Sequence, residues 1–268
     1  MSGARRLALA IVGAWCVVAV VASLAPPPAN LVSLPDILAT PGAGAILGRD
    51  DLGRSVAMRL AAGARISLAV AAAVVLLTAT FGTALGLLAG WCGGWTERLL
   101  MRITEVFLAF PGILLAIALA GVLGPGLANV VLALSAVGWV GFARLARAQT
   151  LSLRERDHVQ VAHALGVTPP HIVLRHVLPL LAGPLVVEAS FACAATVVAE
   201  AGLSFLGLGV QPPTPSWGSM IRDGARYLLI APHLVLAPGL ALASLVVAIN
   251  LLGDGLRDRL DPQGGRLH

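Results

Sequence analysis

Long apolar intervals recur along the chain and predict membrane-spanning helices. A transmembrane helix needs about 20 mostly apolar residues, and the uncharged stretch 106–143 is long enough for two, divided where Gly124, Pro125 and Gly126 interrupt it. The predicted spans cover residues 7–24, 66–90, the two halves of 106–143, 185–208 and 233–252. Strands would require an alternating pattern, and backbone in lipid must satisfy its own hydrogen bonds. We therefore expect an all-α, polytopic membrane helix bundle with six transmembrane helices.

The composition supports this assignment and excludes several kinds of chemistry. Of the 268 residues, 58% are hydrophobic and 12% are charged, and the mean hydropathy is +0.90, which excludes an ordinary soluble protein. All 18 residues counted as Lys or Arg are arginines, so the chain has no P-loop lysine and no Schiff-base amine. The arginines are scattered, which argues against nucleic-acid binding. Cys16, Cys92 and Cys193 stand alone and predict neither a disulfide framework nor a metal site.

The distribution of arginines predicts the orientation of the bundle, because cytoplasmic loops carry an excess of basic residues. With both termini inside, twelve arginines, including Arg266, fall in inner segments and six in outer segments. We expect cytoplasmic termini, a first helix and outer segment over residues 1–65, and a five-helix core over residues 66–268 with a cytoplasmic loop at 144–184. Arg5 and Arg6 before the first apolar run leave open a cleaved signal peptide, although the run is longer than a usual signal core.

Two glutamates lie within the fifth predicted span, where a charge is costly. Glu188 and Glu200 are twelve positions apart, which places them about 120° around a helix and ~18 Å along it, too far to form one site. We expect Glu188 near the inner interface, and Glu200 either lines a polar passage or bonds to a neighbouring helix. In the second span, Gly82, Gly86 and Gly90 share one helix face, which predicts close packing against another helix.

The segment between the fourth and fifth spans, residues 144–184, is too long for a turn and too patterned for a flexible linker. It predicts a short helix over 158–165, stopped by Gly166, and a second turn or helix from residue 168. Such an element is typical of a docking site for another protein, or of an amphipathic helix on the membrane surface. The four histidines of this segment lack a matching cluster of cysteines or carboxylates, so a membrane-embedded metalloenzyme has no support.

This segment resembles the EAA loop of permease subunits in bacterial binding-protein-dependent ABC importers. In that family a Glu-Ala-Ala triplet, a Gly four residues after its last Ala and a later Leu-Pro form coupling helices that dock on the cytosolic ATPase. Here the triplet position reads Gln160-Val161-Ala162, so the family's Glu is replaced, while Ala162, Gly166, Leu178 and Pro179 match. The residues implied in ATPase coupling are Gln160, Val161, Ala162, His163, Ala164, Leu165, Gly166, Leu178 and Pro179.

Three further segments narrow the resemblance to the dipeptide, oligopeptide and nickel importers, specifically their second, C-type permease. Residues 47–55, Leu-Gly-Arg-Asp-Asp-Leu-Gly-Arg-Ser, resemble the outer segment before span two, with Arg49 in place of a usual Thr and Ser55 in place of a usual Asp. The others are Phe-Leu-Ala-Phe-Pro at 107–111 and the stretch 199–218, which contains Ala-Glu-Ala-Gly-Leu-Ser and Pro-Ser-Trp-Gly. Together they cover most of the chain from Leu47 onward.

The resemblance implies a subunit of an ATP-driven importer in the bacterial inner membrane, forming half of a translocation pathway for peptides, with nickel chelates as the next cargo. It implies as partners a homologous second permease, an extracytoplasmic substrate-binding protein, membrane lipid, and two P-loop ATPase subunits or domains that bind ATP and Mg²⁺. By this reading the chain itself is not an enzyme, binds no cofactor or metal, and takes no nucleic acid.

The resemblance also implies an outer face that receives the binding protein. The candidate docking residues are Asp50, Asp51, Arg54, Trp217 and Arg222, and the candidate pathway residues are Glu188 and Glu200. Residues 217–228 carry apolar side chains at helical spacing and predict an amphipathic helix outside the membrane, or one lying on the lipid surface. The alternative function is an ion-coupled secondary transporter that uses Glu200 as its cation site.

Overall fold

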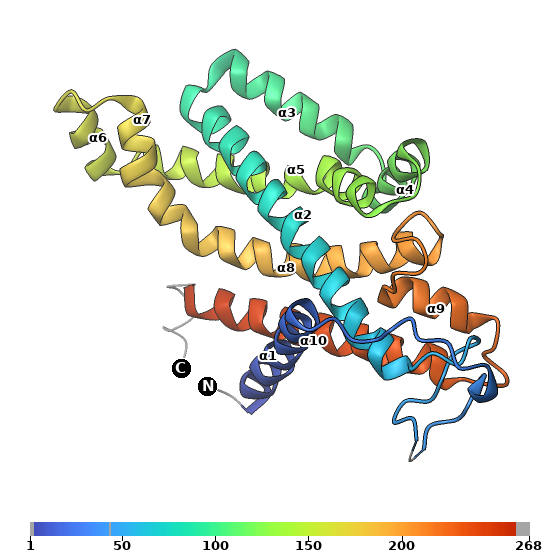
Figure 1. Cartoon of the computed structure of the whole chain (residues 1–268). Coiled ribbons are helices and arrows are strands. Elements are labelled where there is room, and N and C mark those ends of the chain that lie inside the picture. The colour runs from blue at the N-terminus through green and yellow to red at the C-terminus, as the bar shows by residue number, and fades with distance from the viewer. Residues whose placement is uncertain (1–2, 43, 261–268) are drawn as a thin grey trace.

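The computed structural model describes residues 3–42 and 44–260 as a bundle of α-helices (Figure 1). The longer helices are α1 (Gly3–Leu24), α2 (Val56–Cys92), α3 (Gly94–Leu108), α4 (Gly112–Leu123), α5 (Leu127–Arg154), α8 (Leu178–Phe205) and α10 (His233–Leu260). Shorter elements are η1 (Leu34–Asp36), α6 (Asp157–Ala164), α7 (Pro169–Ile172), η2 (Val173–Val177) and α9 (Trp217–Ala225). The predicted all-α membrane bundle is confirmed. Arg266, counted among the inner arginines, lies outside the described residues.

Five of the six predicted spans correspond to single helices or continuous helical runs, and the sixth falls on a bent pair of helices. Within the described residues, five helices are long and apolar enough to cross a membrane: α1, α2, α5, α10 and the continuous run from α7 through α8. The sixth requires α3 and α4 together, which are bent by 85°. The third span was expected to start at Val106, whereas α3 begins at Gly94 and ends before Pro111. Because Pro111 has no N–H to donate, it starts α4 and does not continue α3.

Helix α2 packs along α5 through the glycine face that the sequence predicts. A methyl group added at Gly82 would clash with the carbonyl oxygen of Trp139, and one added at Gly86 would clash with that of Ala143. A methyl group added at Gly90 would clash with Thr150 and with the carbonyl oxygen of Arg147, both on α5. Only glycine lets the two backbones approach this closely, so the prediction of close packing is confirmed. The predicted domain division after residue 65 falls inside α2, which begins at Val56.

The bundle has two distinct ends (Figure 1). Helices α6 and α7 lie at one end, and α9 lies at the opposite end beside the segment that joins α1 to α2. Nη2 of Arg5 lies 2.6 Å from Oδ2 of Asp258, so the start of α1 meets the end of α10. Leu260 lies beside Gly183 near the start of α8. Both described termini are therefore at the α6 end of the bundle.

The prolines near α8 differ from the prediction at one position. Pro179 lies in the first turn of α8, where a missing N–H leaves no helical hydrogen bond unmade. Pro184 directly precedes the predicted span 185–208, and the structure places it inside α8, which begins at Leu178. Helices in a membrane tolerate an internal proline because neighbouring helices and local adjustments satisfy the freed backbone groups.

Candidate functional site

A short arm, residues 157–172, extends the bundle at one end and consists of α6 and α7 (Figure 1). Helix α6 stops at Gly166, as predicted: this residue has φ +81°, and its N–H donates to the carbonyl of His163 at 3.0 Å. The N–H of Val167 donates to the carbonyl of Ala162 at 3.1 Å. The stop is therefore a defined left-handed turn that favours glycine, and any other side chain at position 166 would strain it.

The arm has a buried side and an exposed side. Val159 and Ala162 pack with Ile172 against the ends of α2, α5 and α8. On the other side, Val161 and Leu165 are 57% and 79% exposed although both are apolar. Of the other predicted coupling residues, Leu178 is half-buried and the exposed ones are Gln160, His163, Ala164, Gly166 and Pro179. The arm is thus anchored to spanning helices while it presents an apolar surface outward.

A groove of about 400 Å³ lies beside the exposed side of the arm. Its lining comes from the ends of α2 and α5 and from α6: Trp91, Arg154, Glu155, Val159, Gln160, His163 and Ala164. Arg154 also donates to the carbonyl of Gly90 at 3.1 Å, which ties α5 to the end of α2. Gln160, the residue that replaces the family's Glu, therefore sits in a groove shared by three helices.

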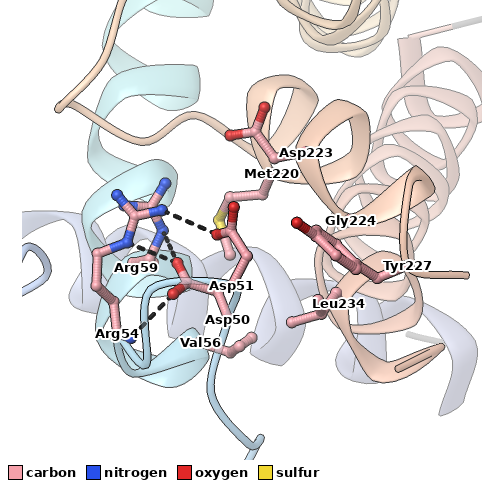
Figure 2. Close-up of a pocket in the computed structure, with 10 residues that line it drawn as sticks. All are labelled: Asp50, Asp51, Arg54, Val56, Arg59, Met220, Asp223, Gly224, Tyr227 and Leu234. Carbon is pink, nitrogen blue, oxygen red and sulfur yellow. Dashed lines mark hydrogen bonds and ion pairs between the residues drawn. The ribbon is translucent and has the colours of Figure 1, made fainter. Parts of the chain in front are cut away.

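At the opposite end, Asp50 organises the turn that precedes α2 (Figure 2). Its carboxylate accepts hydrogen bonds from the backbone N–H groups of Leu52 and Arg54 at 3.0 and 2.9 Å. It also pairs with the guanidinium of Arg54 at 2.7 Å and with that of Arg59 at 3.3 Å. Asp51 makes a longer contact to Arg54, at 3.5 Å. One carboxylate therefore compensates two guanidinium groups that are largely withdrawn from solvent.

Helix α9 is fixed in the bundle by Trp217. The side chain has no exposed surface, its Nε1 donates to the carbonyl of Leu60 at 3.1 Å, and its ring meets that of Trp15 edge-on at 4.9 Å. Ser216 and Ser219 form a capping box at the start of the helix. Trp217 therefore holds α9 against α1 and α2 and presents no surface to a partner in this structure.

Three of the candidate docking residues meet in one cavity of about 200 Å³ between α9 and the turn before α2. Asp51, Arg54 and Arg222 line it together with Arg59, Asp223 and Arg226, so basic groups outnumber acidic ones. Nε of Arg222 pairs with Asp223 at 3.1 Å. Asp50 lies behind Arg54 and Arg59, where it supports this basic surface.

A cavity of about 800 Å³, open to the surface, is bounded by α2, α4, α5, α8 and α10; we call it the central cavity. Most of its wall is apolar or small. The polar exceptions are Thr78 on α2, Glu188 and Thr196 on α8, and Asn250 on α10. A volume of this size is in the range of sites that hold small-molecule ligands.

The two glutamates of α8 have different surroundings. Glu188 lies on the wall of the central cavity. Glu200 has no exposed surface and accepts hydrogen bonds from the hydroxyls of Ser67 and Ser204, each at 2.8 Å. Of the two roles considered for Glu200, the structure shows the bond to a neighbouring helix, since Ser67 belongs to α2. The sequence indicated correctly that the two carboxylates do not form one site.

The sequence analysis did not identify Thr78 and Asn250 as residues of the central cavity, or Trp91 as a residue of the groove beside the arm. A single Asn in an otherwise apolar span was a usable signal for Asn250, whereas nothing in the local sequence distinguishes Thr78 from a structural threonine.

Over residues 3–42 and 44–260, no group of three or more His, Cys, Asp or Glu side chains could hold a metal ion. His158 and His176 lie near each other, with ring centroids 6.5 Å apart.

Comparison with known proteins identifies the family. Residues 82–263 match the family described as "Binding-protein-dependent transport system inner membrane component". The chain belongs to this family. The glutathione transport system permease protein GsiD of Pectobacterium atrosepticum is 46% identical over 217 residues, which cover 81% of this chain and 72% of that protein. GsiD of Escherichia coli O6:K15:H31 is 45% identical over 216 residues, which cover 81% and 71%.

Solved structures of an ABC transporter share this fold. A chain of the MetNI methionine ABC transporter in an inward-facing conformation superimposes with a TM-score of 0.62 and 20% identity, covering 75% of this permease and 96% of that chain. A second crystal form of the same transporter gives a TM-score of 0.57. The protein is thus a multi-pass inner-membrane permease of a bacterial ABC importer, of the dipeptide, oligopeptide and nickel type, and its family works with ATPase and substrate-binding partners.

Proposed function

We propose that this permease forms half of a peptide pathway and that a homologous second permease supplies the other half. The central cavity supports this, because a mostly apolar chamber with a few polar groups suits a small amphipathic cargo. The curated relatives named above are permeases of glutathione transport systems, and glutathione is a small peptide. We therefore take small peptides as the cargo class.

The observation that carries the proposal is the two-sided arm. Its buried side is fixed to α2, α5 and α8, while Val161 and Leu165 are exposed. A load applied to that surface would be transmitted directly to three spanning helices. We propose that two P-loop ATPase subunits or domains bind there, that ATP and Mg²⁺ are bound by those partners, and that hydrolysis takes place on them. The docking energy must differ between the two states of the transporter, since equal contact in both would shift nothing.

Gln160 affects the kind of contact that the arm would make with the ATPase. A Glu at this position would carry a charge into the groove, whereas Gln160 presents a neutral amide that both donates and accepts hydrogen bonds. We propose that position 160 contributes a neutral hydrogen bond to this contact, beside the apolar packing of Val161 and Leu165.

The proposed orientation follows from the arm. With the α6 end in the cytoplasm, both described termini lie there, and the α9 end faces outward. The cavity lined by Asp51, Arg54 and Arg222 is then the surface offered to a substrate-binding protein, with Asp50 behind it. Trp217 serves this surface by fixing α9.

Substitution of Gly166 tests the docking proposal. Gly166→Val strains a left-handed turn, so we expect co-purification of the ATPase subunits and ATP-driven uptake to fall together, by about tenfold for each ~1.4 kcal/mol of docking energy lost. The matched control is Gly239→Val in α10, where an added methyl group meets nothing within 4 Å. Normal association and normal uptake in the Gly166 variant would count against the arm as the docking element.

A further inference from the structure

The wall of the central cavity carries one ionisable group. Its lining contains Glu188 and no arginine, lysine or histidine of the described chain, and the remaining polar groups, Thr78, Thr196 and Asn250, are neutral. The carboxylate therefore sets the sign of the electrostatic potential inside the chamber. The surrounding wall is mostly apolar and Glu188 is half-buried, so water screens its charge less than that of a fully exposed carboxylate.

Glu188 combines partial burial with the absence of a partner, which no other acidic residue of the described chain does. Among the described residues, Asp157, Glu188 and Asp254 are the carboxylates without a hydrogen bond or ion pair from another side chain or a backbone N–H, and Asp157 and Asp254 are exposed to solvent. Glu188 is half-buried. A carboxylate withdrawn from water is costly unless a cation or a hydrogen-bond donor compensates it. The compensating group is not supplied by the described part of this chain.

The neighbouring helix leaves room for this carboxylate. A Cβ atom added at Gly141 of α5 would lie 2.6 Å from Oε1 of Glu188. Glycine at this position therefore lets the acidic group stand between α8 and α5 without a clash. Asn250, on the wall of the same chamber, offers an amide that can donate to a carbonyl oxygen or accept from an N–H.

We propose that Glu188 is the subsite that receives the ammonium group of the cargo as it crosses the central cavity. An α-amino group supplies the positive charge and the three hydrogen-bond donors that the carboxylate lacks. The inference rests on the proposed function, and it deepens it: the pathway favours peptides with a free amino terminus over solutes that are anionic or blocked at that position. The apolar remainder of the wall accommodates the rest of the peptide without reading its sequence.

The test compares charge at position 188 with charge on the cargo. The complete transporter, with its second permease, ATPases and binding protein, is reconstituted in proteoliposomes, and ATP-driven uptake of glutathione and of N-acetylglutathione is measured. Glu188→Gln keeps the size of the side chain, removes its charge and replaces one acceptor oxygen with an NH2 donor. We expect glutathione uptake to fall by about tenfold, the effect of one lost charge-assisted hydrogen bond, while N-acetylglutathione uptake is unchanged. Glu188→Asp retains the charge and recovers part of the loss.

Two controls separate this role from a structural one. Glu105→Gln removes an exposed carboxylate of α3 that pairs with Arg102 outside the cavity, and should leave uptake of both solutes unchanged. Stimulation of ATP hydrolysis by the loaded binding protein, and co-purification of the second permease, should match wild type in Glu188→Gln. Loss of co-purification would instead assign the carboxylate to a contact with the second permease and overturn the proposal.

The remaining outcomes are equally decisive. Glutathione uptake by Glu188→Gln equal to wild type, equal losses for both solutes, or equal losses in the Gln and Asp variants would each overturn the ammonium subsite. If the wild-type transporter carries no N-acetylglutathione, glutathione uptake by Glu188→Gln is compared with uptake by Glu188→Asp. A greater loss in the Gln variant supports the ammonium subsite. A wild-type transporter that carries no peptide with ATP would contradict the proposed function itself. That result differs from a transporter that carries peptides with ATP but whose uptake does not depend on the charge at position 188.

Discussion

Asp50 shows how a single residue holds the surface at the α9 end. It compensates Arg54 and Arg59 and also accepts two backbone N–H bonds, so the turn before α2 closes around one carboxylate. Arg59 is buried, and removal of its anionic partner would leave an uncompensated charge. Breaking a buried ion pair in this way costs more than the pair contributes when intact.

Asp50→Asn should therefore loosen this turn, by ~3 kcal/mol in local unfolding free energy. Hydrogen exchange of the backbone amides of Leu52 and Arg54, in the purified transporter, measures the change. Asp51→Asn is the matched control, because Asp51 is more exposed and contacts Arg54 only at 3.5 Å, so its loss should cost less than about 1 kcal/mol. Equal exchange rates in the two variants would show that Asp50 is not the organising residue.

For single residues, the sequence predicted relationships within one helix but not contacts with residues far away along the chain. Helical spacing alone separated Glu188 from Glu200, because both belong to one helix. The partner of Glu200 could not be found that way, since Ser67 is 133 positions away and reaches it only through the packing of α2 on α8. Glu188 was expected near the inner interface, and its place on the cavity wall depends on five helices that the sequence does not arrange.

At the scale of elements, the α2–α5 contact depends on glycines whose helical propensity is poor. Alanine normally stabilises a helix by about 1 kcal/mol relative to glycine. At Gly86 the sign should reverse, because the added methyl group clashes with the carbonyl of Ala143. We expect Gly86→Ala to destabilise the permease by ~1–3 kcal/mol, as overpacking does.

The melting temperature of the purified transporter in detergent measures this effect. Gly121→Ala in α4 is the control, because the added methyl group meets nothing within 4 Å and the substitution should be neutral or stabilising. A Gly86 variant as stable as the Gly121 variant would contradict the close contact between α2 and α5.

Elements with strong local signals were predicted well, and those decided by their neighbours were not. The stop of α6 was predicted from Gly166, and α9 from the apolar spacing over 217–228, although the helix ends at Ala225. The break between α3 and α4 was missed, since Pro111 fits equally the start of a span and the middle of a bent one. The local sequence also did not show that α8 continues through Pro184, because packing against neighbouring helices keeps the helix intact there.

At the scale of the whole molecule, the arm with its exposed apolar side and the charged turn before α2, which lies with α9, are at opposite ends of the bundle (Figure 1). The cavity with Glu188 is lined by α2, α4, α5, α8 and α10. This arrangement suits a passage that receives cargo at one face and is driven from the opposite face. The sequence motifs predicted the two ends, whereas the cavity emerges only when the helices are assembled.

The central claim is that this passage is driven by a separate ATPase acting on the arm, and reconstitution tests it most directly. Glutathione uptake is measured in proteoliposomes that contain the complete transporter with ATP and no ion gradient. It is also measured in proteoliposomes that contain the two permeases alone, with a proton or sodium gradient and no ATP. We predict uptake only in the first preparation. Uptake by the permeases alone, driven by the gradient, would contradict the account and favour an ion-coupled transporter.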